Sequence, residues 1–115
     1  MSNFPAFIPY ENTTVRAITM NGVTKFVARD LCKLLGYPRA DKMLDPFVTT
    51  APEYISFMTP GGTQSVRVVA REEIETVLAH CRHKNVASVR NWLHHHTRRT
   101  TRGFVAVGVI HEQER

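Results

Sequence analysis

The chain has 115 residues, of which 43% are hydrophobic and 22% charged, as in ordinary globular proteins. These values exclude a mostly disordered chain, a collagen-like repeat and a disulfide scaffold, and the length favours one domain with a real core. No apolar run approaches the ~18 residues needed to cross a bilayer. The first residues lack the basic and apolar regions of a signal peptide, so we expect a cytoplasmic protein. Cys32 and Cys81 lie in apolar helical patterns and are predicted to be free, buried thiols.

The first element predicted with a clear pattern is a β-hairpin. Residues 1–13 contain two prolines and no clear period, so we expect a loosely held lead-in there. Residues 15–20 and 23–26 are predicted to be strands. Asn21-Gly22 joins them, and both residue types tolerate the positive φ of a tight turn.

Two helices are predicted after the hairpin. Residues 27–35 place apolar side chains on one helical stripe. Gly36 fits the left-handed position after a helix, and Pro38 prevents continuation. Residues 38–44 predict a second short helix, which Pro46 should end.

A second hairpin and a third helix are predicted next. Residues 54–58 and 65–69 are expected to be strands, and residues 59–64 are rich in turn formers, which predicts a longer hairpin loop. Residues 70–81 carry apolar side chains on one helical face. Acidic residues in the first turns of this segment suit the positive end of a helix dipole.

The last third predicts a fourth helix and a final strand. The helix should run over about residues 85–96, and Arg98 and Arg99 would share its polar side if it extends that far. Arg102-Gly103 breaks the pattern, and the β-branched run 104–110 predicts a strand. The expected fold is therefore α+β, a small antiparallel sheet of hairpins with three to four short helices.

The positive charge is concentrated in the last third of the chain. Residues 1–75 carry eight basic and eight acidic side chains, so the net charge of +5 belongs to residues 76–115. No acid occurs between Glu75 and Glu112, and all six histidines fall in that interval. Such asymmetry favours a surface that binds a polyanion, although a solvated basic helix that keeps the protein soluble has the same pattern.

The histidines, together with Cys81, raise the alternative of a metal site. Zinc sites normally combine paired ligands at defined spacing, and that pairing is missing here. Consecutive helical residues point about 100° apart, so only one or two of His94, His95 and His96 could converge. We therefore expect histidines that are structural or face nucleic acid, with no metal and no cofactor.

Asp30 and Trp92 are both interpreted as structural. Asp30 opens the first predicted helix, where a carboxylate stabilises the helix dipole or pairs with a nearby arginine. Trp92 lies in line with Val89 and Leu93, which predicts a core anchor, whereas a base-stacking platform would need an exposed ring. No nucleophile, base and orienting group can be named together, so we expect no enzyme.

Two motifs resemble the Bro-N domain family. Residues 26–37, FVARDLCKLLGY, resemble its opening motif of an aromatic residue, Val-Ala-x-Asp and a later Leu-Gly-Tyr. Residues 90–93, RNWL, resemble its later Arg/Lys-x-Trp-apolar motif. The resemblance covers about residues 14–103 and leaves 104–115 as a C-terminal strand and tail. Bro-N domains occur in viral Bro proteins and phage or prophage antirepressor-like proteins, so the resemblance implies a regulatory binding module.

Charge and resemblance together predict a phage- or prophage-type transcriptional regulator that binds double-stranded DNA through a basic C-terminal helical face. The alternative is a protein-binding antirepressor that sequesters a repressor or host regulator without contacting DNA. In either case we expect the protein in the host-cell cytoplasm. An apolar edge strand at 104–110 would invite association, so we also predict a homodimer. The predicted nucleic-acid-binding residues are Arg82, Lys84, Arg90, Asn91, His94, His95, Arg98, Arg99 and Arg102.

Overall fold

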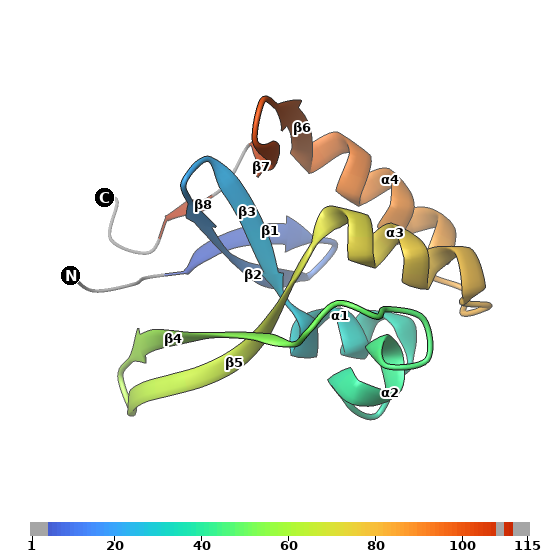
Figure 1. The fold of residues 1–115 in the computed structure, drawn as a ribbon, viewed down its shortest axis with the longest axis horizontal. Helices are drawn as coiled ribbons and strands as arrows, with labels where there is room; N and C mark the ends of the chain where they lie inside the picture. Colours follow the sequence, from blue (N-terminus) through green and yellow to red (C-terminus); the bar gives the residue numbers. More distant parts are fainter. Residues whose placement is uncertain (1–4, 108–109, 112–115) are drawn as a thin grey trace.

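Antiparallel strands and four helices make up the computed structural model, which describes residues 5–107 and 110–111 (Figure 1). The main sheet has six strands in the order β4-β5-β3-β2-β1-β8, and β6 and β7 form a separate hairpin. This is the α+β class predicted from the sequence. The strands are β1 (Ala6–Tyr10), β2 (Thr13–Met20), β3 (Val23–Val27), β4 (Glu53–Thr59), β5 (Gly62–Ala70), β6 (Thr97–Thr100), β7 (Gly103–Ala106) and β8 (Ile110–His111). The helices are α1 (Ala28–Leu35), α2 (Ala40–Leu44), α3 (Arg71–His80) and α4 (Val86–His96).

The β2–β3 hairpin and helix α1 confirm the prediction for this part of the chain. Asn21 and Gly22 both have positive φ, 55° and 77°, as the tight turn requires. Helix α1 ends at Gly36, whose φ is 77° and whose N–H donates to the carbonyl of Cys32. A Cβ at this glycine would lie 2.7 Å from the ring of His83, so the close approach of the two segments also requires glycine.

The lead-in expected over residues 1–13 contains a strand instead. β1 lies between β2 and β8, and the side chain of Ile8 is fully buried. Pro9 hides this strand in the sequence because proline lacks the backbone N–H that a ladder hydrogen bond needs. In the structure Pro9 pairs with Thr14 of β2, and the described pairing with β8 involves only Ala6 and Phe7. The proline therefore occupies the part of β1 where an amide donor is dispensable.

The hairpin between β4 and β5 is tighter than predicted. Thr59 pairs directly with Gly62, which leaves Pro60 and Gly61 as a two-residue turn in place of the longer loop expected over 59–64. Gly62 has a φ of 113°, a value that side-chain-bearing residues rarely adopt. Both strands therefore extend further toward the turn than the turn-forming residues 59–64 predict.

The C-terminal strand predicted over 104–110 is divided between two sheets. β7 pairs with β6, whereas β8 pairs with β1 in the main sheet. Residues 108–109, also predicted as strand, lie outside the described residues. The described parts of this apolar segment thus find strand partners within the chain, and the homodimer stays a prediction.

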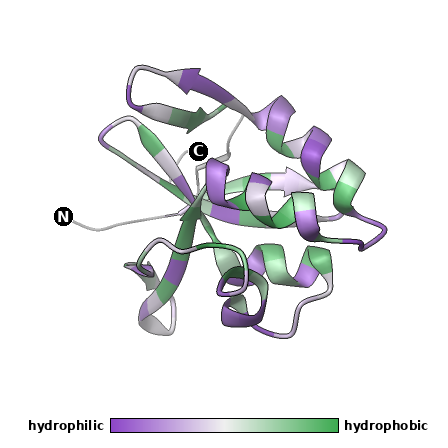
Figure 2. Ribbon diagram, turned by 45° about the vertical axis from the view of Figure 1, so that its right-hand side comes forward, coloured by the Kyte–Doolittle hydropathy of each residue, from purple (hydrophilic) through white to green (hydrophobic). Residues whose placement is uncertain are grey.

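The core occupies both faces of the sheet. On the helix-covered face, Phe26 of β3 packs in the larger cluster with apolar residues of all four helices. Its neighbour Val27 points to the other face and joins a smaller cluster with Phe57 of β4. In Figure 2 apolar and polar residues alternate along α3 and α4, as expected for helices with one buried face. Within the described part of the chain, no helix is long and apolar enough to span a membrane.

Trp92 is the core anchor that the sequence predicts. Its side chain is 7% exposed, and its ring meets those of Tyr10 and Phe26 edge to face at 6.1 and 5.8 Å. The indole Nε1–H donates to the carbonyl of Pro9 at 2.6 Å. One side chain therefore connects α4 with β1 and β3.

Replacing Trp92 by alanine should lower the free energy of unfolding by about 3–5 kcal/mol, because a large buried ring leaves a cavity. Urea denaturation followed by far-UV circular dichroism measures this change. Arg90→Ala, an exposed neighbour on the same helix, is the control and should change stability by less than about 0.5 kcal/mol. Equal, small effects of both substitutions would contradict the anchoring role.

Candidate nucleic-acid interface

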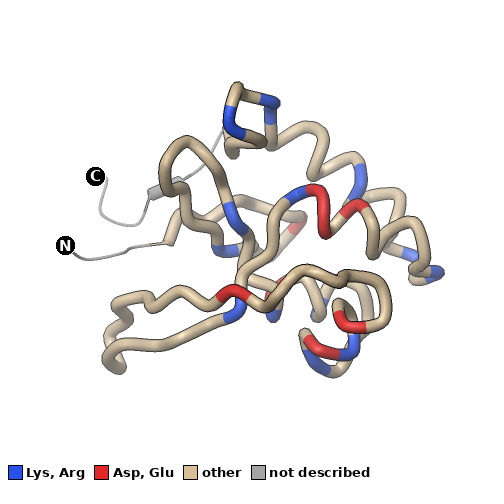
Figure 3. The backbone as a smooth tube through the Cα atoms, in the orientation of Figure 1, with Lys and Arg blue, Asp and Glu red and all other residues tan. Residues whose placement is uncertain are grey.

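The nine residues predicted to contact nucleic acid are all exposed. They lie on three consecutive parts of the chain, and we call them together the C-terminal basic surface. Figure 3 shows lysines and arginines from the α3–α4 connection to the β6–β7 hairpin, and no acidic residue on α4 or on that hairpin. Arg82 and Lys84 precede α4; Arg90, Asn91, His94 and His95 lie on it; Arg98 and Arg99 lie on β6, and Arg102 in the turn that follows.

Helix α4 has one buried and one exposed face. Val89 and Leu93 are buried four residues apart, beside Trp92. Asn91 and His95 share the exposed face, because helical residues four apart lie one above the other. The helix has 11 residues and is therefore about 16 Å long. It presents Arg90 and Asn91 near its middle and His94 and His95 in its last turn, and Lys84 and Arg98 lie just beyond its two ends.

Helix α4 ends at His96, as predicted, so Arg98 and Arg99 do not extend its polar face. Thr97 takes an extended conformation at the end of α4, and its hydroxyl donates to the carbonyl of Leu93 at 2.6 Å. The same hydroxyl accepts a bond from Arg71 Nη1 at 2.8 Å. Strand β6 therefore starts directly after the helix. Adjacent strand residues point to opposite sides, so Arg98 and Arg99 leave the hairpin on different faces.

The β6–β7 hairpin is attached to the rest of the domain by contacts that the sequence analysis missed. The guanidinium carbons of Arg71 and Arg99 lie 4.1 and 4.5 Å from the ring centroid of Phe104. Arg102 Nη1 donates to the carbonyl of Asn21 at 3.3 Å. The N–H of Ala106 donates to the Thr24 hydroxyl at 2.8 Å. Contacts on both strands and on the turn thus hold the hairpin in place, which no local pattern could indicate.

The basic residues of the chain differ in how they are neutralised. All five ion pairs between described residues join partners within residues 16–75, and none includes a lysine or arginine of the C-terminal basic surface. The pairs include Arg16 with Asp30 and Arg71 with Glu75. The positive charge of the C-terminal basic surface is therefore available to an external anion.

The histidines are dispersed over several surroundings. His80 stacks on Phe47 with ring centroids 4.6 Å apart, and His96 is half-buried beside Trp92 at 5.8 Å. His94 and His95 are exposed. Among the described residues, no group of three or more His, Cys, Asp or Glu side chains is arranged to hold a metal ion.

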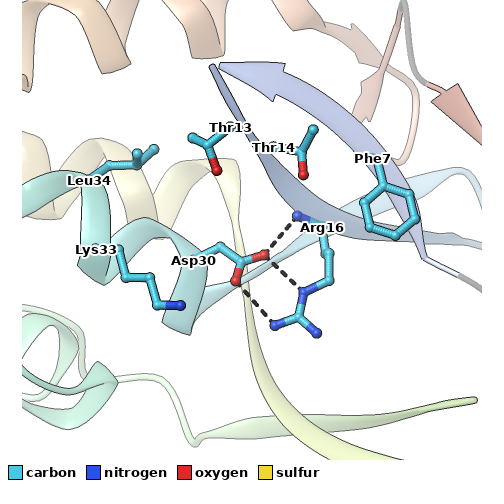
Figure 4. A pocket seen from close by; sticks show the side chains of 7 residues that line it. All are labelled: Phe7, Thr13, Thr14, Arg16, Asp30, Lys33 and Leu34. Carbon is cyan, nitrogen blue, oxygen red and sulfur yellow. Dashed lines mark hydrogen bonds and ion pairs between the residues drawn. The ribbon is translucent and has the colours of Figure 1, made fainter. Parts of the chain in front are cut away.

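Asp30 forms the structural ion pair that the sequence suggested. Its Oδ2 accepts bonds from the backbone N–H and from Nε of Arg16, at 2.9 and 3.0 Å, and its Oδ1 accepts one from Nη2 at 3.1 Å (Figure 4). The pair lies in a pocket of about 330 Å³ that Thr13, Thr14 and Lys33 also line. Asp30 is the single acid among the lining residues. Its bonds connect α1 to β2.

The two cysteines are both free, but only one is buried as predicted. Cys32 is 3% exposed and lies 3.8 Å from the sulfur of Met43, whereas Cys81 is half-buried. Burial raises the pKa of the Cys32 thiol from 9.0 to about 11, because an apolar environment disfavours the thiolate. Cys32 is thus a core residue rather than a nucleophile.

No protein-family model, curated protein or solved structure matches this chain. The resemblance to the Bro-N family therefore depends on the two sequence motifs alone.

The Cys32 thiol should make stability pH-dependent. The folded thiol keeps its proton up to a pKa of about 11, whereas the unfolded one loses it near 9.0. Its contribution to stability is complete below pH 9 and is lost as the pH rises to 11, about 2–3 kcal/mol in total. Denaturant titrations of the wild type and Cys32→Ala across this range measure the difference. Parallel losses of stability in both proteins would contradict the assignment.

Proposed function

We propose that this chain is a phage- or prophage-type transcriptional regulator, Bro-N-like and antirepressor-like, that binds double-stranded DNA through the C-terminal basic surface. The observation that carries the proposal is electrostatic. The lysine and arginines of this surface are exposed and without an ion-pair partner among the described residues, whereas those that form ion pairs lie before residue 76. Such a surface attracts the phosphate backbone and releases its counterions.

The surface divides into parts suited to different contacts. Asn91 lies in the middle of the exposed face of α4, and an asparagine amide can form two hydrogen bonds with adenine in the major groove. A major groove about 12 Å wide admits an α-helix. Arg98 and Lys84 lie beyond the two ends of the helix, where phosphates of the groove walls would run. Helix α4 would thus contact bases, and the residues beyond its two ends would contact the DNA phosphates.

A second candidate function is capture of a repressor or host regulator. Tyr54 and Met58 of β4 are 62% and 45% exposed, on the same face of the strand. Large apolar side chains exposed on one face of a strand can be buried by a partner protein. This face is separate from the C-terminal basic surface, so the two candidates can be tested independently.

Affinity for random-sequence duplex DNA should fall steeply with salt. Four to six phosphate contacts give a slope of about −4 to −5 in a plot of log affinity against log salt concentration. Fluorescence anisotropy of a labelled duplex measures it. An absence of salt-dependent binding to duplex DNA, with retention of a repressor in a pull-down, would replace this proposal by the second candidate.

The double substitution Arg90→Ala and Arg98→Ala should flatten that slope by about two, because two counterion-releasing contacts are lost. Neither side chain has a hydrogen bond or ion pair with another described residue, so folding should be unchanged. The matched control is Arg29→Ala with Lys42→Ala, which removes the same charge from exposed positions of α1 and α2. Equal slopes for the two double variants would show that net charge, not this surface, drives binding.

A further inference from the structure

We propose that a pocket beside α4 binds an unpaired guanine base, presented by a free nucleotide or by a single strand of nucleic acid. The pocket measures about 660 Å³ and lies between the β1–β2 turn and one side of α4. It shares Asn91, His94 and His95 with the C-terminal basic surface. The inference does not depend on duplex binding, because its ligand is a single base and not a groove.

The floor of the pocket consists of rings whose polar atoms are already bonded. Trp92 donates its indole N–H to the carbonyl of Pro9, and the Tyr10 hydroxyl is hydrogen-bonded to that of Ser88. The two rings meet edge to face with centroids 6.1 Å apart. These bonds give the floor a stable shape, and little of either ring is exposed. The exposed rings of His94 and His95, which also line the pocket, provide the flat surface on which an aromatic ligand can stack.

The mouth of the pocket carries polar groups that the fold does not use. Among the described residues, the carboxylate of Glu11, the amide of Asn91 and the ring nitrogens of His94 have no hydrogen-bond or ion-pair partner. Glu11 occupies the turn between β1 and β2 with a φ of 53°, a left-handed conformation that favours glycine or asparagine. Glu11 is also the single acid among the lining residues. The turn therefore holds one carboxylate beside imidazole and amide groups.

The lone carboxylate selects among the bases. A carboxylate only accepts hydrogen bonds, and its two oxygens match two donors that lie side by side. Guanine offers such a pair, N1–H and the N2 amino group. Adenine and cytosine place a ring-nitrogen acceptor beside their amino group, and uracil and thymine place carbonyl oxygens on both sides of N3–H. Glu11 would therefore repel an acceptor atom of every other base. The Asn91 amide can donate a hydrogen bond to guanine O6, and the histidine rings can stack on the base.

Trp92 provides a direct readout, because it is the one tryptophan of the chain and lines the pocket. GMP, AMP, CMP and UMP should be titrated into the full-length protein while tryptophan fluorescence is followed. We expect saturable quenching by GMP and an affinity about tenfold or more above that for the other three nucleotides, the discrimination of one well-formed bidentate contact. Absence of saturable quenching by any guanine ligand, or equal affinity for all four, would overturn the proposal.

The two sources of guanine are distinguished with short single strands. If the physiological ligand is a strand, a decathymidylate with one central guanine should bind more tightly than GMP. Its affinity should also fall as the salt concentration rises. GMP binding that is as tight as that strand identifies a free nucleotide. The control is a decathymidylate without guanine. In either case it should bind more weakly than the strand that contains one guanine.

Glu11→Gln is the decisive variant, because its amide replaces one acceptor by a donor. It should reduce the preference for GMP about tenfold or more. The matched control is Glu72→Gln, an exposed carboxylate on α3 that does not line this pocket. His94→Ala, which removes a stacking ring, should weaken all four nucleotides together. Retention of the guanine preference in Glu11→Gln, with an unchanged thermal midpoint, would refute the assignment.

Failure of this inference differs from failure of the proposed function. The Arg90→Ala, Arg98→Ala double variant should lose duplex affinity and keep the quenching by GMP. Conversely, Glu11→Gln should keep its duplex affinity or bind more tightly, because it removes a negative charge near the C-terminal basic surface.

Discussion

Trp92 joins the C-terminal helix to the N-terminal strand, and much of the molecule depends on that contact. Its ring packs between Tyr10 of β1 and Phe26 of β3, and its N–H satisfies the carbonyl of Pro9. Because this side chain fixes one face of α4 against the sheet, the opposite face with Asn91 must point outward. The same packing brings the β1–β2 turn beside the helix and creates the pocket proposed to bind a base. Burial of one ring thus determines the position of both candidate sites.

The second constraint is the abrupt end of α4. Thr97 bonds back to the Leu93 carbonyl and receives Arg71, so the chain leaves the helix as a strand. The resulting hairpin is held by Phe104 under two guanidinium groups and by the bond from Arg102 to Asn21. A hairpin that is already ordered loses little conformational entropy when it contacts a ligand. Its arginines can therefore contribute to binding without first being ordered by it.

The described basic side chains are of two kinds: some form ion pairs within the fold, and others are free to attract an external anion. Arg16 illustrates the first kind, because Asp30 accepts three of its hydrogen bonds and fixes α1 on β2. Arg90 and Arg98 illustrate the second, since no described acid lies within ion-pair distance of either. Exposed charges that form no pair keep their attraction for a polyanion and add little to stability. The proposed DNA contact follows from this division rather than from net charge alone.

The sequence by itself determined the features that depend on a few neighbouring residues. Asn21-Gly22 specified a tight turn through its tolerance of positive φ, Gly36 ended α1 for the same reason, and the spacing of Val89, Trp92 and Leu93 marked the buried face of α4. The exposure of Arg90, Asn91, His94 and His95 was also foreseen, because polar residues opposite an apolar stripe face solvent.

Only the tertiary structure decided the features that join distant segments. β1 was hidden because Pro9 argues against a strand, and its pairing with β2 overrides that local signal. Arg98 and Arg99 continue a polar helical pattern, yet a bond from Arg71, 26 residues earlier, helps to hold the chain where the helix gives way to a strand. The pocket that contains Glu11 and Trp92 exists only after residues some eighty positions apart have packed together. Local periodicity carries no information on such contacts, because their free energy comes from burial between elements and not from the conformational preference of either segment.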